Sequence, residues 1–353
     1  MTASSRQAAA PRRRLSLAAL ARWETLLVIL LVLLTIAGTR MSKVFLSSAN
    51  FANLTSSVME VAIMALPMTL IIILGDIDLS VESMVGLAGA VLGTLMVAGM
   101  PLPLAIPIVL LIGALGGLLN GLLVTWAGLP ALVVTLGTLA LFRGFANVLL
   151  GPTVISVWPD WFTEFGFGTI LRSPIPYSLV VFAVLVVIYT LVTHGTWIGR
   201  QVFASGKNKD ASRYSGVRVD TIRTWLFILS GMIAALAGII LTARFSSARN
   251  DNGTGLTLTV VTVVLLGGVD INGGKGSIPG VVLAVFVLAM LQNILRLAGV
   301  SSEYQSIAIG LLLILSVIVP QLARQTGVVI DRARRGRRPP AGSVAPGEVT
   351  TQP

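Results

Sequence analysis

Several stretches of this chain are apolar on every face over most of the length of a membrane-spanning helix, and this feature limits the possible folds most strongly. Residues 26–36 and 102–115 contain no ionisable side chain. Because lipid offers the backbone no hydrogen-bond partner, a chain in a bilayer must form helices or a closed barrel. Barrel strands alternate apolar and polar residues over about ten positions, and these stretches do not. The sequence therefore predicts an all-α, polytopic bundle of transmembrane helices.

The composition supports a membrane protein and argues against several kinds of site. Of the 353 residues, 55% are hydrophobic and 11% are charged, whereas soluble proteins carry about 25% charged residues. The absence of cysteine excludes disulfides and thiolate metal sites, and the single histidine argues against a histidine metal site. We therefore expect no metal, no cofactor and no catalytic centre.

The apolar runs predict about ten transmembrane helices, with about eight to eleven compatible with their lengths, since about 20 residues span a bilayer. The flanking regions are expected to be a cytoplasmic lead-in over 1–22 and a basic, disordered cytoplasmic tail over 324–353, around a transmembrane domain over 23–323. A signal peptide at the N-terminus is the alternative. The run 256–268 is short enough to be broken or re-entrant. The expected segments are 23–38, 57–74, 83–99, 102–126, 130–150, 175–193, 224–243, 256–268, 279–298 and 304–323.

The distribution of charge predicts the orientation of the bundle. The net charge of +11 comes from 25 Lys and Arg residues against 14 Asp and Glu residues. The basic residues cluster beside the apolar runs with few aromatic neighbours, which favours the positive-inside rule for a protein in membrane lipid over nucleic-acid binding. Segment 194–223 holds six basic and two acidic residues. We therefore place 194–223 and both termini in the cytoplasm, and 151–174 outside.

One internal repeat predicts a bundle of two pseudo-repeated halves. Residues 68–80 align without gaps on 260–272, which places Gly75 over Gly267 and Asp78 over Asp270. Duplicated halves are common in transporters. Chance matching of apolar runs is the alternative, because only the glycine and aspartate positions are informative.

Polar residues at helix junctions and inside apolar runs are candidates for the translocation pathway. Ser80 or Asp78 could cap a helix that begins near Glu82, and a helix broken here could also present its end to the pathway. Arg143 lies within the apolar run 136–150, where a buried charge needs a partner, and Glu60 is a candidate for that partner. The alternative is that the Arg143 side chain snorkels to the membrane interface. The predicted pathway residues are Asp76, Asp78, Ser80, Asn120, Arg143, Asn147 and Asp270.

Two further segments have specific interpretations. Segment 194–223 is too charged to enter lipid, and residues 201–215 could form a short helix that lies across the membrane face and docks on a soluble partner. A solvated connector is the alternative. Residues 273–277, Gly-Gly-Lys-Gly-Ser, lack the spacing and the βαβ context of a phosphate-binding loop, so we expect a tight turn between helices.

Four motifs in this order resemble the ribose-type permeases of bacterial ATP-binding cassette (ABC) importers, over roughly residues 45–322. They are Gly75-Asp-Ile-Asp-Leu-Ser-Val81, Thr135-Leu-Gly-Thr138 with Arg143-Gly144, Ala204-Ser-Gly-Lys-Asn208 with Ser215-Gly216-Val217, and Leu266-Gly-Gly-Val-Asp270 with Gly273-Gly-Lys-Gly-Ser277.

The resemblance implies a permease subunit in the cell inner membrane that imports a monosaccharide and is not itself an enzyme. Its partners would be cytoplasmic ATP-binding cassette subunits, a second permease chain, identical or different, and an extracytoplasmic sugar-binding protein. The segment similar to the family's cytoplasmic loop, 199–223, would contact the ATPase. The implied coupling residues are Arg200, Ser205, Gly206, Asn208, Arg213, Ser215, Gly216 and Arg218.

The resemblance leaves the solute open. Asp76 departs from the commoner Gly-Gly-Ile-Asp-Leu-Ser pattern, which puts ribose in doubt. The acidic turn and the Trp-Pro-Asp-Trp-Phe stretch look most like rhamnose-type members, so rhamnose or another deoxyhexose or pentose is expected, although related permeases also carry autoinducer 2. The alternative function is an ion-coupled secondary transporter of a small polar solute, which would use Glu60, Asp76 or Asp78.

Overall fold

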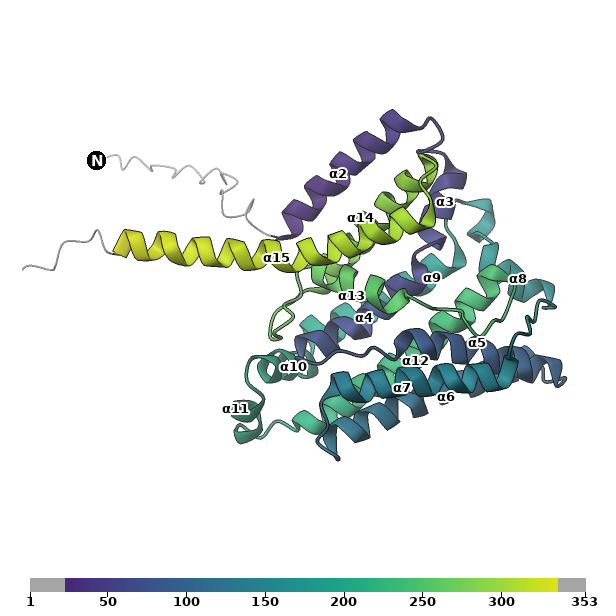
Figure 1. Ribbon diagram of the computed structural model, residues 1–353, viewed down its shortest axis with the longest axis horizontal. Helices are drawn as coiled ribbons and strands as arrows, with labels where there is room; N and C mark the ends of the chain where they lie inside the picture. Colours follow the sequence, from purple (N-terminus) through teal and green to yellow (C-terminus); the bar gives the residue numbers. More distant parts are fainter. Residues whose placement is uncertain (1–22, 336–353) are drawn as a thin grey trace, which may run out of the picture.

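The computed structural model describes the backbone of residues 23–335 and the side chains of 23–171 and 173–318, and regular structure in this part is helical (Figure 1). The expected lead-in over 1–22 and the part of the expected tail over 336–353 lie outside the described residues. The helices, including the one-turn 3₁₀ segment η1 and the π turn η2, are α2 (Trp23–Met41), α3 (Ser48–Ser56), α4 (Met59–Ile73), α5 (Val81–Val97), α6 (Leu102–Thr125), α7 (Ala131–Leu150), α8 (Asp160–Phe167), η1 (Ile170–Arg172), α9 (Tyr177–Thr190), η2 (Leu191–Gly195), α10 (Trp197–Lys207), α11 (Lys209–Tyr214), α12 (Val219–Phe245), α13 (Leu256–Leu266), α14 (Ile278–Leu297) and α15 (Ser302–Arg335).

Each of the apolar runs expected to be helical lies in a helix, which confirms the polytopic bundle. Within residues 23–335, six helices are long and apolar enough to cross a membrane, namely α2, α6, α7, α9 with η2, α12 and α14. The pair α3 and α4, bent by 45°, makes up to seven. The remaining apolar helices, which are α5, α13 and the part of α15 over 302–318, are shorter. Helix α15 continues to Arg335, so residue 323 does not mark a helix end.

Helix α12 forms the centre of the bundle. It packs against α4, α5 and α6, and 78% of its most apolar window is buried, against 11% for the peripheral helix α2. The approach to α6 depends on glycine, since a Cβ on Gly231 would overlap the carbonyl oxygen of Gly113. Small residues allow such close backbone contact between membrane helices. The apolar residues that α2, α6, α7, α9 and α15 leave exposed surround this core.

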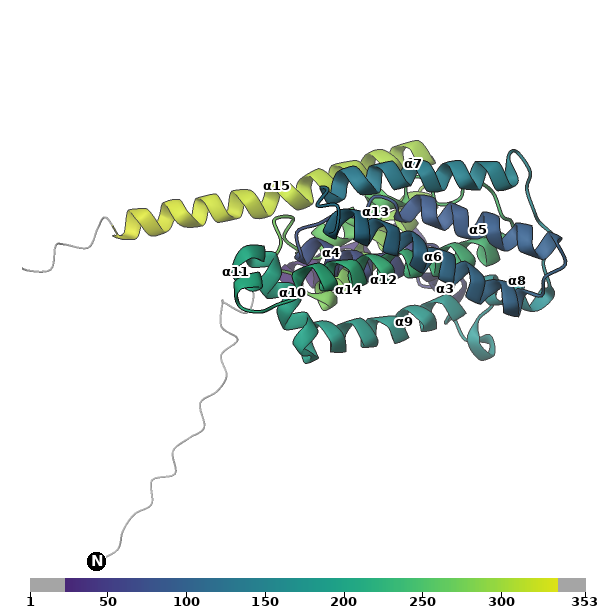
Figure 2. The ribbon, with the colours of Figure 1, turned by 90° about the horizontal axis from the view of Figure 1, so that it is seen from below.

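The two ends of the bundle carry different elements. In Figures 1 and 2, the start of α2 and the end of α15 lie at the end occupied by α10 and α11, and α8 lies at the opposite end. This arrangement agrees with termini on the same side as segment 194–223. That this side is cytoplasmic stays a prediction; the two ends are called inner and outer on that basis below.

The two repeat segments end their helices with the same backbone motif. Asp76 N–H donates to the Ile71 carbonyl (3.0 Å), and Val269 N–H donates to the Val264 carbonyl (3.3 Å), which is the bond that closes a Schellman motif. The left-handed residues are Gly75 (φ 85°) and Gly268 (φ 86°). In backbone conformation, Gly75 therefore corresponds to Gly268 and not to Gly267, so the ungapped alignment is shifted by one residue at the helix end.

Beyond the helix ends, the two aspartates of the repeat do occupy equivalent turns. Asp78 Oδ1 accepts the N–H of Ser80 (3.0 Å), and Asp270 Oδ1 accepts the N–H of Asn272 (3.2 Å). Each is the local side-chain turn that aspartate favours. The second repeat is one residue shorter between its left-handed glycine and its aspartate.

Candidate functional site

The segment between α4 and α5 carries the densest set of predicted site residues. Helix α4 ends at Ile73, the left-handed Gly75 turns the chain, and no regular structure forms before α5 begins at Val81. The break therefore places Asp76 and Asp78 inside the protein at the end of a buried helix, where each carboxylate needs partners.

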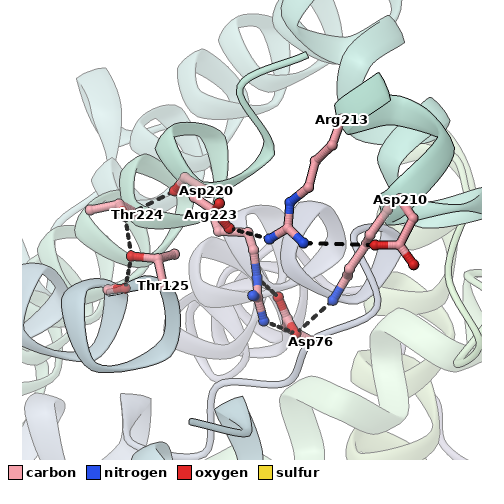
Figure 3. Close-up of polar contacts among 9 residues, drawn as sticks. Asp76, Thr125, Asp210, Arg213, Asp220, Arg223 and Thr224 are labelled. Carbon is pink, nitrogen blue, oxygen red and sulfur yellow. Dashed lines mark hydrogen bonds and ion pairs between the residues drawn. The ribbon is translucent and has the colours of Figure 1, made fainter. Parts of the chain in front are cut away.

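Asp76 binds two cations that come from the predicted cytoplasmic segment. Arg223, near the start of α12, donates from Nε to Oδ2 (2.7 Å) and from a terminal nitrogen to Oδ1 (2.8 Å), as Figure 3 shows. Lys209, the first residue of α11, places Nζ 3.2 Å from Oδ1. The Asp76 side chain is 6% exposed. Removing one partner of a buried ion pair costs about 3–5 kcal/mol because the remaining charge is left without compensation.

A close backbone contact lies beside this ionic cluster. A Cβ on Gly206, near the end of α10, would overlap the carbonyl oxygen of Ile73. The same carbonyl accepts the N–H of Gly274 at 2.7 Å, from the loop between α13 and α14. Both Gly273 and Gly274 have positive φ, so the expected tight turn over 273–277 is confirmed. The end of α4, the end of α10 and this turn thus meet at one point.

The predicted coupling segment forms two helices rather than the single helix expected over 201–215. Asn208 separates α10 from α11, and its Oδ1 accepts the N–H of Ala211 (2.9 Å) as a helix cap. Arg213 binds Asp220 at 2.7 Å (Figure 3). Ser205 is buried and Gly206 is partly buried, whereas the other predicted coupling residues are exposed, namely Arg200, Asn208, Arg213, Ser215, Gly216 and Arg218.

Asp78 belongs to a second network, in which its partners are serine groups rather than cations. Its side chain accepts hydrogen bonds from Ser80 Oγ (2.6 Å) and from Ser230 Oγ of α12 (2.7 Å). Asn120 of α6 donates to Ser80 Oγ at 2.8 Å, while its Oδ1 has no partner among the described residues. The expected cap by Ser80 is wrong, because the side chain of this N-cap residue of α5 makes no capping hydrogen bond. Asp78 instead accepts the backbone N–H of Ser80 at the start of the helix. The network joins the break to α6 and α12.

The remaining pathway candidates lie in two other places. Arg143 of α7 donates to the carbonyl oxygens of Asn250 (2.6 Å) and Asn252 (3.3 Å), and Asn147 accepts from Asn250 Nδ2 (2.9 Å). These contacts hold the loop between α12 and α13. Asp270 instead lies in the loop between α13 and α14, where Gly273 meets Gly206 of α10 at the other end of the bundle. The structure therefore does not gather the predicted pathway residues into one site.

The proposed pairing of Glu60 with Arg143 is wrong. Glu60 Oε1 lies 2.8 Å from Nε of Arg244, on α12, and the Glu60 side chain is buried. Arg143 instead meets backbone carbonyls, because the outer loop folds over α7. Nothing in the sequence distinguishes these two arginines as partners of Glu60.

Beside Arg244 lies a cavity of about 460 Å³ at the outer end of α12. Its lining mixes apolar walls with charged and amide side chains, a composition common in sites for small solutes. The lining residues are Leu241, Arg244, Phe245, Ser247, Arg249, Asp251, Asn252, Gly253, Thr254 and Leu256.

Several residues of the site were not predicted. Lys209 and Arg223 belong to a basic segment in which no pattern marks a pairing with Asp76, although a buried acid predicts some cation nearby. Ser230 is an ordinary hydroxyl within an apolar helix. Glu82 accepts the N–H groups of Gly255 and Thr257 at the start of α13 (3.1 and 3.2 Å), a contact across the fold.

Comparison with known proteins defines the class of the chain. The family described as "Branched-chain amino acid transport system / permease component" matches residues 50–317. The chain belongs to this family, which confirms its resemblance to the ribose-type permeases of bacterial ABC importers. It is a multi-pass protein of the inner membrane.

Individual relatives are similar over nearly their whole length. The autoinducer 2 import system permease protein LsrD of Yersinia enterocolitica is 38% identical over 322 residues, covering 89% of this chain and 96% of that protein. LsrD of Enterobacter sp. strain 638 is 39% identical over 302 residues (84% and 92%), and LsrD of Photorhabdus luminescens is 36% identical over 325 residues (89% and 96%). No solved structure matches the chain. These relatives do not support the expected rhamnose specificity.

Proposed function

We propose that this chain is the permease subunit of an ABC importer for autoinducer 2, a sugar-like solute, and that separate ATP-binding cassette subunits supply the energy. The observation that carries the proposal is the similarity to LsrD permeases, which extends over 96% of the Yersinia enterocolitica protein. If the similarity covered only the short motifs at the helix ends, it would support membership of the family but not a particular solute.

The state of the buried acids favours ATP-driven import over the ion-coupled alternative. An ion-coupled carrier needs a carboxylate that can exchange a proton or a sodium ion during transport. Among the described side chains, Glu60 binds Arg244, Asp76 binds Arg223 and Lys209, and Asp78 accepts hydrogen bonds from Ser80 and Ser230. Each candidate acid is thus already engaged within the protein.

The helices α10 and α11 provide the surface on which an ATPase subunit would dock. They lie at one end of the bundle, and Arg200 and Arg218 are exposed there. A loaded binding protein would deliver the solute at the opposite end, where the 460 Å³ cavity lies. A second permease chain, identical or different, would complete the transmembrane unit by covering part of the exposed apolar surface.

Uptake assays test the proposal. Cells that lack their own autoinducer 2 importer would express this chain with its ATPase subunits, second permease and binding protein. We expect removal of autoinducer 2 from the medium, and loss of that uptake when the ATPase subunits are inactivated. Uptake of rhamnose without autoinducer 2 would refute the proposed solute, and uptake that survives ATPase inactivation would refute the proposed energy source.

A further inference from the structure

The contacts of Asp76 have a consequence beyond holding the fold together. We infer that Asp76 is a positioning residue that transmits movement of α10 and α11 to the break between α4 and α5, with Lys209 as the moving contact and Arg223 as the fixed one. We call these three residues the Asp76 clamp. The inference rests on the proposed docking of an ATPase on α10 and α11.

Two contacts join α10 and α11 to the break between α4 and α5, and they resist movement in opposite directions. At Gly206 the backbone of α10 already touches the Ile73 carbonyl, so any approach of α10 pushes directly on the end of α4. The ion pair between Lys209 and Asp76 resists separation of the same elements. Packing resists compression and an ion pair resists extension. Displacement in either direction is therefore passed to the break.

The break can pass this displacement into the bundle. Asp76 lies two residues before Asp78, whose carboxylate binds Ser230 of α12. Ser80, bonded to Asp78, also accepts the amide of Asn120 on α6, and α5 begins at the next residue. A shift at Asp76 must consequently stretch these bonds or move α5 relative to α6 and α12.

The two cations of the clamp differ in the way that this mechanism requires. The Arg223 side chain is 12% exposed and makes two short hydrogen bonds to Asp76 from the core helix α12. The Lys209 side chain is 33% exposed and makes one contact, at 3.2 Å, from the short helix α11. Arginine forms a rigid two-point grip, whereas lysine is a point charge on a flexible stem. Arg223 thus fixes Asp76 to the bundle, and Lys209 connects it to the docking element.

This difference separates a transmitting role from a merely structural one. Loss of the partly exposed Lys209 should leave the assembled protein intact, because Arg223 still neutralises Asp76. Transport per ATP hydrolysed should nevertheless fall, because α11 no longer pulls on the break. A purely structural role would change assembly or thermal stability and leave that ratio unchanged.

Because the chain has no cysteine, Lys209→Cys in the complete importer permits chemical rescue. The complex in proteoliposomes, with loaded binding protein, would be treated with one of two methanethiosulfonate reagents, each of which forms a disulfide with the cysteine and releases methanesulfinate. The aminoethyl reagent attaches an aminoethylthio group and the methyl reagent attaches a methylthio group. The first restores a cation of nearly lysine length, and the second does not. The same folded protein is then compared in two charge states, with the treated wild-type complex as reagent control and Lys43→Cys, an exposed lysine between α2 and α3, as matched control.

We expect the ratio of solute imported to ATP hydrolysed to fall about ten-fold in Lys209→Cys, within the usual range of coupling between sites. The aminoethyl reagent should restore the ratio and the methyl reagent should not, while Lys43→Cys stays at the wild-type ratio. An unchanged ratio in Lys209→Cys, or equal rescue by both reagents, would overturn the clamp. ATP-independent import by the wild-type complex would instead refute the proposed function, so the two failures are distinguishable.

Discussion

The inner and outer ends of this permease use charged residues in opposite ways. At the inner end, Asp76 is buried and joins cations from two elements, 133 and 147 residues away in the chain. At the outer end, Arg249 and Asp251 pair within one loop, two residues apart, and both side chains are more than half exposed. A buried pair is weakly screened and geometrically specific, whereas an exposed pair is screened by salt and water. The inner charges can therefore transmit force between elements, and the outer pair can only shape a local surface.

The contacts of Arg143 and Glu60 show how charges are held near the outer end. Arg143 supports the outer loop through backbone carbonyls rather than through a carboxylate. The buried Glu60 pairs with Arg244, which itself lines the outer cavity. The charged residues of the cavity lining, Arg244, Arg249 and Asp251, are thus each paired within the protein.

The largest effect expected from this comparison is at Asp76. Asp76→Asn leaves Arg223 buried beside a neutral amide, and we expect a loss of about 3–5 kcal/mol in the free energy of unfolding. The melting temperature of the purified permease, in a single detergent, measures the loss. Asp210→Asn removes an exposed acid whose contact to Arg213 is 3.8 Å long, and serves as the matched control with little change. Equal stability of both variants would contradict the buried character of the inner cluster.

A smaller loss is expected at the packing contact beside the clamp. A Cβ on Gly206 overlaps the backbone oxygen of Ile73, which cannot move aside as a flexible side chain can. Gly206→Ala should therefore cost about 1–3 kcal/mol, as overpacking usually does. Gly195→Ala is the control, since nothing lies within 4 Å of a Cβ there. If the two substitutions lower the melting temperature equally, the close contact between α10 and α4 is wrong.

The sequence alone predicted the elements much better than their contacts. Hydropathy located the apolar helices, because each must satisfy its own backbone in lipid whatever its neighbours are. The division of the coupling segment at Asn208 does have a signal in the sequence, since asparagine followed by Lys-Asp favours a helix start. The sequence carries no signal for the partner of Glu60, because Arg143 and Arg244 are both available and the choice between them depends on how α7 and α12 pack. The one-residue shift of the repeat, in which Gly268 rather than Gly267 is the left-handed residue, also depends on backbone conformation. An alignment of apolar residues contains no information on backbone conformation.

The repeat illustrates the same division between local and tertiary information. Asp78 and Asp270 form equivalent turns because aspartate binds the backbone two residues ahead, a preference carried by the local sequence. Their surroundings differ: Asp78 reaches Ser230 on α12, and Asp270 lies in the glycine turn beside α10. Local chemistry is repeated in the two halves, whereas the tertiary role is not.

The smallest effect is expected at the outer pair, and its size depends on pH. The hydrogen bond from Arg249 holds the pKa of Asp251 below its ordinary value, and the charge of Arg249 adds to this. Because the folded pKa is depressed, the pair stabilises the protein above the unfolded pKa of about 4. That contribution is lost as the pH falls through the lower folded pKa.

Melting temperatures measured from neutral pH down to about pH 3, on either side of the ordinary aspartate pKa, test this expectation. Asp251→Asn should melt within error of the wild type at neutral pH and moderate salt, because both partners are solvated. At low salt the wild type should show a slightly steeper loss of stability below about pH 4 than the variant, since only the wild type can protonate Asp251. A neutral-pH loss comparable to that of Asp76→Asn would mean that the outer pair also links separate elements. The contrast between the two ends would then be wrong, and the outer loop would have to be considered a second point at which force enters the bundle.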